Sequence, residues 1–124
     1  MNTQLPKIEE WAFQFALRII RLVRALPKDY ASRAMGQQVL RSGASIGANV
    51  EEAIGGSSKK DFAAKTAIAA KEARETHDWL RLLRDSETVP ANRIAPLIQE
   101  SLEIKKILAK TVSTTRKRLA ARQT

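Results

Sequence analysis

The sequence predicts an all-α fold, an antiparallel four-helix bundle with up-down-up-down connectivity, and three observations lead to this prediction. The composition is rich in Ala, Leu, Ile, Lys and Arg and has only five glycines and four prolines, as in helical proteins. Apolar residues recur at helical spacing in four segments, near residues 8–26, 30–55, 59–85 and 91–120. The breaks between these segments are short, which forces consecutive helices to lie antiparallel.

The first helix, near residues 8–26, carries two apolar stripes. The core-facing stripe contains Ile8, Trp11, Ala12, Phe15, Ile19, Leu22, Val23 and Leu26. The second stripe lies nearly opposite and contains Phe13, Leu17 and Ile20. Because a helix in a four-helix monomer needs only one buried face, the second stripe predicts an interface with another subunit. The alternative is that these are scattered surface apolar residues, which are common.

The second helix, near residues 30–55, is rich in small residues. Gly43 and Gly47, like Ala44 and Ala48, lie four apart, a spacing that lets another backbone approach closely. Each glycine inside a helix costs about 0.5–1 kcal/mol relative to alanine, so two of them indicate a packing or bending role. Polar residues line the flank of its apolar stripe at about one-turn intervals: Arg41, Ser45, Asn49 and Glu52.

The third helix, near residues 59–85, places Glu72 and Glu75 in an otherwise apolar band. A buried unpaired charge costs several kcal/mol, so we expect these carboxylates to pair with Arg41, Ser45 or Asn49. Paired carboxylates can also act as general acid and base or as metal ligands. We favour the structural network.

The fourth helix, near residues 91–120, loses its apolar character after Thr111 and ends in a basic segment. Pro96 should lie in or near its first turn, because deeper in the helix it would break a backbone hydrogen bond. We expect a frayed tail over residues 114–124. No linker, repeat or low-complexity block indicates a second domain, so residues 1–124 are predicted to form a single domain.

The net charge of +9 and the pI near 10.4 favour a polyanionic partner, with nucleic acid ahead of an anionic membrane surface or an acidic protein. The alternative is a helical protein with many solvated surface cations. No recognised nucleic-acid module is present, so contacts with phosphates would make binding salt-sensitive and weakly sequence-selective. The candidate nucleic-acid-binding residues are Arg18, Arg21 and Arg24 in the first helix and Arg116, Lys117 and Arg118 in the tail.

Several classes of function are disfavoured by what the sequence lacks. It has no cysteine, one histidine (His77) and no GxSxG, Walker or dinucleotide motif, so we predict no enzyme, no catalytic residue, no metal and no cofactor. It also has no secretory signal pattern and no apolar run long enough to span a membrane. The absence of cysteine suits a reducing compartment, and we expect a cytoplasmic protein that does not bind membranes.

Three stretches carry a family resemblance: RSGASIGANVEEA at residues 41–53, GGSSKKDF at 55–62 and KEARETHDWLRLL at 71–83. They resemble the small bacterial four helix bundle protein family. That family includes proteins encoded in intervening sequences of 23S rRNA genes and the accessory variability-determinant subunit of diversity-generating retroelements. The resemblance implies a homopentameric barrel of four-helix protomers, which in the retroelement members associates with a reverse transcriptase and with RNA or DNA. Members often carry proline at the position of Gly47.

Three hypotheses of different classes follow. The one we favour is a non-catalytic, homo-oligomeric bundle that acts as a nucleic-acid-binding accessory protein, with RNA or DNA and a reverse transcriptase as partners. The second is a structural or protein-interaction bundle with no role in nucleic-acid binding. The third is a small enzyme that uses Glu72 and Glu75 in a polar cavity between the second and third helices.

Overall fold

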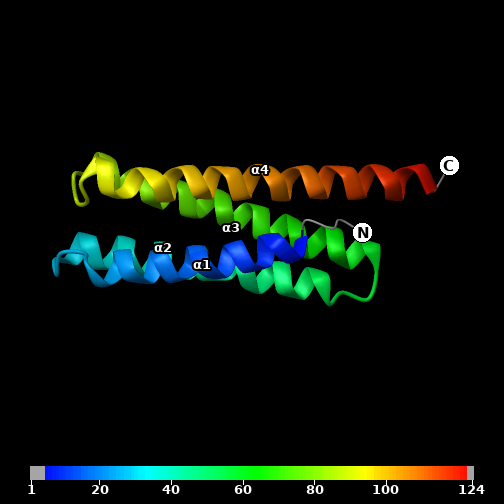
Figure 1. The fold of residues 1–124 in the computed structure, drawn as a ribbon, viewed down its shortest axis with the longest axis horizontal. Coiled ribbons are helices and arrows are strands. Elements are labelled where there is room, and N and C mark those ends of the chain that lie inside the picture. Colours follow the sequence, from blue (N-terminus) through cyan, green and yellow to red (C-terminus); the bar gives the residue numbers. More distant parts are fainter. Residues whose placement is uncertain (1–4, 123–124) are drawn as a thin grey trace.

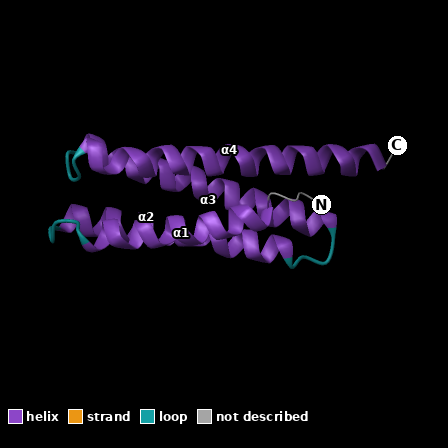
Figure 2. Ribbon diagram, viewed as in Figure 1, coloured by secondary structure: helices purple, strands orange, loops and turns teal. Residues whose placement is uncertain are grey.

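The computed structural model describes residues 5–122, which form four α-helices and contain no strand (Figures 1 and 2). The helices are α1 (Leu5–Arg24), α2 (Tyr30–Ile54), α3 (Lys59–Asp85) and α4 (Ala91–Arg122). Consecutive helices run in opposite directions along the long axis of the molecule. The all-α, four-helix prediction is therefore confirmed, whereas assembly into an oligomeric barrel stays a prediction.

The helices do not contact one another equally. α2 packs on both α1 and α3, α3 packs on α4, and α1 meets α4 over only a short stretch. α1 and α3 do not pack against each other, so they lie across the diagonal of the bundle. The C-terminal end of α4 projects beyond the end of the other helices (Figure 1).

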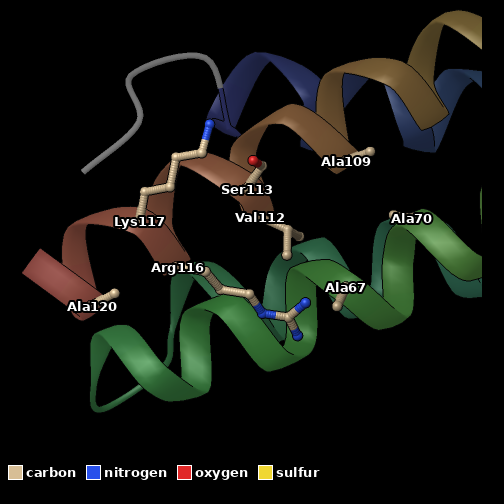
Figure 3. A pocket seen from close by; sticks show the side chains of 8 residues that line it. All are labelled: Ala67, Ala70, Ala109, Val112, Ser113, Arg116, Lys117 and Ala120. Carbon is tan, nitrogen blue, oxygen red and sulfur yellow. The ribbon is translucent and has the colours of Figure 1, made fainter.

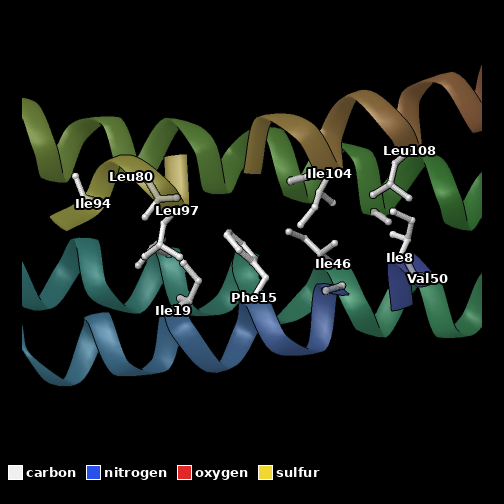
Figure 4. Packing of buried hydrophobic residues seen from close by; sticks show 14 of the residues in the cluster. Ile8, Phe15, Ile19, Ile46, Val50, Leu80, Ile94, Leu97, Ile104 and Leu108 are labelled. Carbon is white, nitrogen blue, oxygen red and sulfur yellow. The ribbon is translucent and has the colours of Figure 1, made fainter. Parts of the chain in front are cut away.

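The core runs along the bundle axis and takes residues from all four helices (Figure 4). Its largest fully buried apolar side chains are Phe15, Ile19, Ile46, Leu80, Leu83, Ile94, Ile104 and Leu108. The interior also contains a polar layer, where the buried hydroxyls of Ser42 and Thr76 are hydrogen-bonded at 2.8 Å. A buried hydroxyl without a partner would cost free energy, so this bond favours one register of α2 on α3.

Three glycines of α2 face α1. A Cβ added at Gly43 would lie 3.2 Å from Cγ1 of Ile19, and one added at Gly36 would lie 3.0 Å from Cδ1 of Leu26. At Gly47 the added Cβ would meet the Cβ of Ala12 at 3.5 Å, an ordinary contact distance. The small-residue pattern of α2 therefore serves close packing against α1.

Two helices begin at side-chain caps. The backbone N–H of Ser32 donates to the Asp29 carboxylate at 2.9 Å, which starts α2 and lowers the pKa of Asp29. The backbone N–H of Asp61 donates to Oγ of Ser58 at 3.1 Å, which starts α3. Both caps satisfy a donor that the first helical turn leaves without an intrahelical partner.

α1 is displaced relative to the predicted range of 8–26. It begins at Leu5, because a proline such as Pro6 is tolerated in a first turn, where its missing N–H would be unpaired anyway. It ends at Arg24, because Pro27 disfavours the helical conformation in the residue before it. Leu26 nevertheless remains in the core.

α4 begins at Ala91, as predicted, and differs from the sequence-based expectation toward its C-terminal end. Pro96 lies in the second turn, where it removes the hydrogen bond to the carbonyl of Asn92 without ending the helix. The helix continues to Arg122, so the expectation of a frayed tail is wrong for residues 114–122. Lys, Arg, Leu and Ala in this segment favour helix, and the hydroxyl of Thr115 donates to the carbonyl of Thr111 at 2.8 Å. Residues 123–124 lie outside the described part of the chain.

The contacts of Gly43 and Gly47 predict different changes in stability when each residue is replaced by alanine. Gly47→Ala should raise the free energy of unfolding by about 0.5–1 kcal/mol, because alanine favours helix and its methyl group fits beside Ala12. Gly43→Ala should gain less or lose stability, because Ile19 must move. Urea unfolding of the two variants checks this, and equal gains would show that α1 does not lie this close to α2.

Candidate functional site

The first polar cluster lies at the edge between α2 and α3. Nη1 of Arg41 lies 3.3 Å from Oε2 of Glu72, and Nη2 of Arg41 pairs with Glu75. Nε1 of Trp79 donates to Glu75 at 3.1 Å. The structure thus brings together Arg41, Glu72 and Glu75 from the predicted seam. Their side chains are 48%, 16% and 34% exposed, so the cluster lies at the surface rather than in the core.

The other predicted members of this seam have different partners. The Ser45 hydroxyl donates to the carbonyl of Arg41 at 2.7 Å, and the Asn49 amide donates to the carbonyl of Ser45 at 2.8 Å. Both bonds stay within α2, so neither residue holds a carboxylate of α3. Glu52 forms an exposed ion pair with Lys65 at 2.9 Å. Arg41 alone accounts for the pairing of the two α3 carboxylates.

A second cluster of the same composition joins α1 to α4, and the sequence reasoning missed it. Nε1 of Trp11 donates to Oε1 of Glu100 at 3.0 Å, and Nε of Arg18 donates to Oε2 of Glu100 at 3.1 Å. The sequence spacing could have indicated this cluster. Glu100 lies three residues after Leu97 and four residues before Ile104, and both of these residues are buried. A carboxylate at such a position needs a partner on a neighbouring helix.

This second cluster corrects the predicted basic band of α1. Arg18 forms an ion pair with Glu100, so it is not a free cation for a phosphate. Arg21 and Arg24 are exposed. They follow Arg18 at steps of three, and each step offsets the side chain by only about 60° around the helix, so Arg21 and Arg24 remain an exposed basic edge on one side of α1.

The second apolar stripe of α1 is partly uncovered. Phe13 is 58% exposed, whereas Leu17 and Ile20 are half-buried. The backbone of Phe13 lies close to α2. Its nitrogen is 3.9 Å from the position that a Cβ added at Gly47 would take. An exposed phenylalanine ring of this kind is costly in water unless something covers it.

An open groove runs between the first half of α3 and the second half of α4, with a volume of about 600 Å³ (Figure 3). Small side chains line it: Ala67 and Ala70 on α3, and Ala109, Ser113 and Ala120 on α4, with Val112 between them. Arg116 and Lys117 complete the lining, and the guanidinium of Arg116 points toward α3. The predicted basic residues of the tail thus lie on a helix beside a groove.

The described residues offer little for catalysis. Residues 5–122 contain no group of three or more His, Asp or Glu side chains that could hold a metal ion. His77 is half-buried, and burial lowers its pKa although the Asp78 carboxylate opposes the shift. Glu72 and Glu75 both form ion pairs with Arg41, so both carboxylates are engaged in the contact between α2 and α3. Across the same range, no helix is both long and apolar enough to cross a membrane.

Four antiparallel helices, two clusters that each combine tryptophan, arginine and glutamate, and a basic groove place the chain among small helical bundle proteins. The chain belongs to the 23S rRNA-intervening sequence protein family, whose family model matches residues 6–110. This confirms the resemblance that the sequence motifs indicated. Arg116, Lys117 and Arg118 lie beyond the matched range.

One solved structure extends this similarity to three dimensions. It is a protein of unknown function from the S23 ribosomal protein family of Bacteroides thetaiotaomicron VPI-5482. The two chains are 36% identical, superpose with a TM-score of 0.82, and the match covers 90% of this chain and 99% of that one. Among curated proteins, none matches.

The α1–α4 cluster generates a prediction about stability. Glu100→Ala should lower the free energy of unfolding by about 1.5–3 kcal/mol, because Trp11 and Arg18 would both be left without their charged acceptor. Glu103→Ala is the matched control, since Glu103 is exposed and bonds only the side chain of Gln99, and it should change stability by less than about 0.5 kcal/mol. Chemical denaturation measures both, and equal effects would contradict a stabilising role for Glu100.

Proposed function

We propose that this chain is a non-catalytic, self-assembling helical bundle of the cytoplasm that binds the phosphate backbone of nucleic acid. The observation that carries the proposal is the charge of the second half of α4. No acidic residue follows Glu103, whereas seven cations do: Lys105, Lys106, Lys110, Arg116, Lys117, Arg118 and Arg122. Within residues 5–122 none of these cations takes part in an ion pair.

Unpaired cations concentrated on one helix favour a polyanion over a small ligand. Such a row raises the local positive potential and attracts phosphates without reading bases. The family's name links it to 23S rRNA genes, so RNA is the first nucleic acid to test. A reverse transcriptase is a further partner to test by co-purification, on the basis of the resemblance to retroelement subunits.

The non-catalytic part of the proposal rests on how the carboxylates are used. Glu72 and Glu75 are held by Arg41 and Trp79, and Glu100 is held by Arg18 and Trp11. Carboxylates bound in this way connect neighbouring helices, which favours a structural role over proton transfer to or from a substrate. This favours an accessory protein over the enzyme hypothesis.

The self-assembly part rests on the exposed stripe of α1. Phe13 is its most exposed residue, and the half-buried Leu17 and Ile20 continue the stripe along the helix. A second copy that covers this stripe would remove apolar area from water. The assembly we propose is the homopentamer that the family resemblance implies.

Phe13→Glu tests the assembly. The fold should persist, because Phe13 does not contribute to the core, whereas the oligomer should dissociate, because a charge would be buried at the interface. Tyr30→Glu is the matched control, since Tyr30 is an aromatic residue that is 90% exposed and lies outside the stripe. Multi-angle light scattering measures the mass of each protein, and a monomeric parent chain rules the assembly out.

Titration with a fluorescent RNA duplex at low salt tests nucleic-acid binding. The logarithm of the binding constant should fall linearly with the logarithm of the salt concentration, with a slope of about −0.9 for each phosphate contacted. Sequence changes in the duplex should have little effect, because backbone contacts carry no sequence information. If no RNA or DNA binds at low salt, the structural or protein-interaction bundle becomes the better description.

A further inference from the structure

We propose that the nucleic-acid contact surface of this chain is the groove between α3 and α4, and that this groove takes one sugar–phosphate backbone of a double helix. The proposal rests on the function proposed above and adds a location and a class of ligand to it. It also transfers the main site from the α1 arginines to a surface that includes α3, which the sequence reasoning did not consider.

The floor of the groove admits a close approach. Its lining side chains on both helices are mostly alanine and serine, so the helix surfaces themselves form the walls (Figure 3). Two packed helices have axes about 8–10 Å apart, a spacing suited to one backbone ridge lying between two rows of side chains. The lining contains no aromatic residue, so bases have nothing to stack on. These features favour a duplex backbone over a single strand.

Cations flank the groove on the α3 side. Lys71 lies four residues after the lining residue Ala67, and Arg74 lies four residues after Ala70. Residues four apart lie on the same face of a helix, one turn further along. Lys71 and Arg74 are both exposed, and neither makes an ion pair within the described range.

The α4 side carries a matching row. Lys110 lies seven residues before the lining residue Lys117, and Lys106 lies seven residues before Ser113, so both continue the same face of α4. Both are exposed. Arg116 lines the groove, and its guanidinium points toward α3 (Figure 3). A single anionic strand along the groove would therefore meet cations on both sides.

Two acidic residues continue the faces of these rows beyond one end of the groove. Asp78 lies one turn beyond Arg74 on α3, and Glu103 lies one turn before Lys106 on α4. Because α3 and α4 are antiparallel, both carboxylates lie toward the same end of the helix pair, away from Arg116 and Lys117. The residues that line the groove itself include two cations, Arg116 and Lys117, and no acidic residue.

The opposite side of the bundle is less suited to phosphate. On α1, Arg18 is held by Glu100, and the remaining Arg21 and Arg24 lie on a helix that also carries the exposed Phe13. α1 and α3 do not pack against each other, so a copy that covers the α1 stripe would leave the α3–α4 groove accessible. The assembly and the nucleic-acid contact can therefore use different faces.

The test compares two fourfold variants with the same reduction in charge. The groove variant is Lys71→Gln, Arg74→Gln, Lys110→Gln and Lys117→Gln; the control variant is Arg21→Gln, Arg24→Gln, Lys28→Gln and Arg33→Gln. All eight residues are exposed, so both variants should fold, and circular dichroism checks this. The groove variant should bind an RNA duplex at least about tenfold more weakly at low salt, with a salt slope smaller by about one for each phosphate that it no longer neutralises. The control should bind no more than about threefold more weakly, from the change in net charge.

A third variant, Ala109→Trp, separates shape from charge. It fills the exposed floor of the groove and leaves the net charge unchanged, so it should also weaken duplex binding. The probes are one RNA duplex, the DNA duplex of the same sequence, one strand of each, and polyglutamate as an acidic polypeptide. Duplexes should bind more tightly than their single strands and more tightly than polyglutamate.

The outcomes separate the two proposals. If the parent protein binds no nucleic acid at low salt, the proposed function fails and this inference fails with it. If the parent binds but the groove and control variants are weakened equally, or Ala109→Trp binds like the parent, the groove is overturned and the proposed function stands. Tighter binding of single strands overturns the duplex assignment, and preferential binding of polyglutamate assigns the groove to an acidic protein instead.

Discussion

The close approach of α1 to α2 is the constraint on which the rest of the bundle depends. Gly43 leaves space for the side chain of Ile19, and Gly36 leaves space for Leu26. A side chain at either position would push α1 outward, and interiors as dense as those of proteins tolerate such overpacking poorly. Because α1 meets α4 only briefly, α2 is the surface that holds α1 in the bundle.

The two clusters of tryptophan, arginine and glutamate add polar contacts between helices to the close packing that the glycines allow. One joins α1 to α4 through Glu100, and the other joins α2 to α3 through Glu75. In each, a carboxylate accepts from an indole N–H and from a guanidinium, so polar groups at the edge of the core have protein partners. Apolar packing sets the distances between helices, and these clusters favour one set of facing residues at two of the seams.

The order and approximate limits of the helices could be predicted from the sequence because apolar periodicity and short breaks are local signals. The pairing of Arg41 with Glu72 could also be predicted, since charges within apolar bands of two consecutive helices must find each other. The pairing of Arg18 with Glu100 could not be predicted, because Glu100 is far away in the sequence and on a helix that α1 only touches. The groove could not be foreseen, since it depends on how the faces of α3 and α4 are set against each other.

The position of the two tryptophans has a spectroscopic consequence. Trp11 is bonded in the α1–α4 cluster and Trp79 in the α2–α3 cluster, and the chain contains no other tryptophan. The intrinsic fluorescence of the protein therefore comes from two reporters, one at each seam. With one indole replaced by phenylalanine, the emission of the other can be followed alone: Trp11 bonds Glu100 across the α1–α4 contact, and Trp79 bonds Glu75, which Arg41 of α2 holds. The order in which α1 and α3 separate from their neighbours on unfolding can thus be read without adding any label.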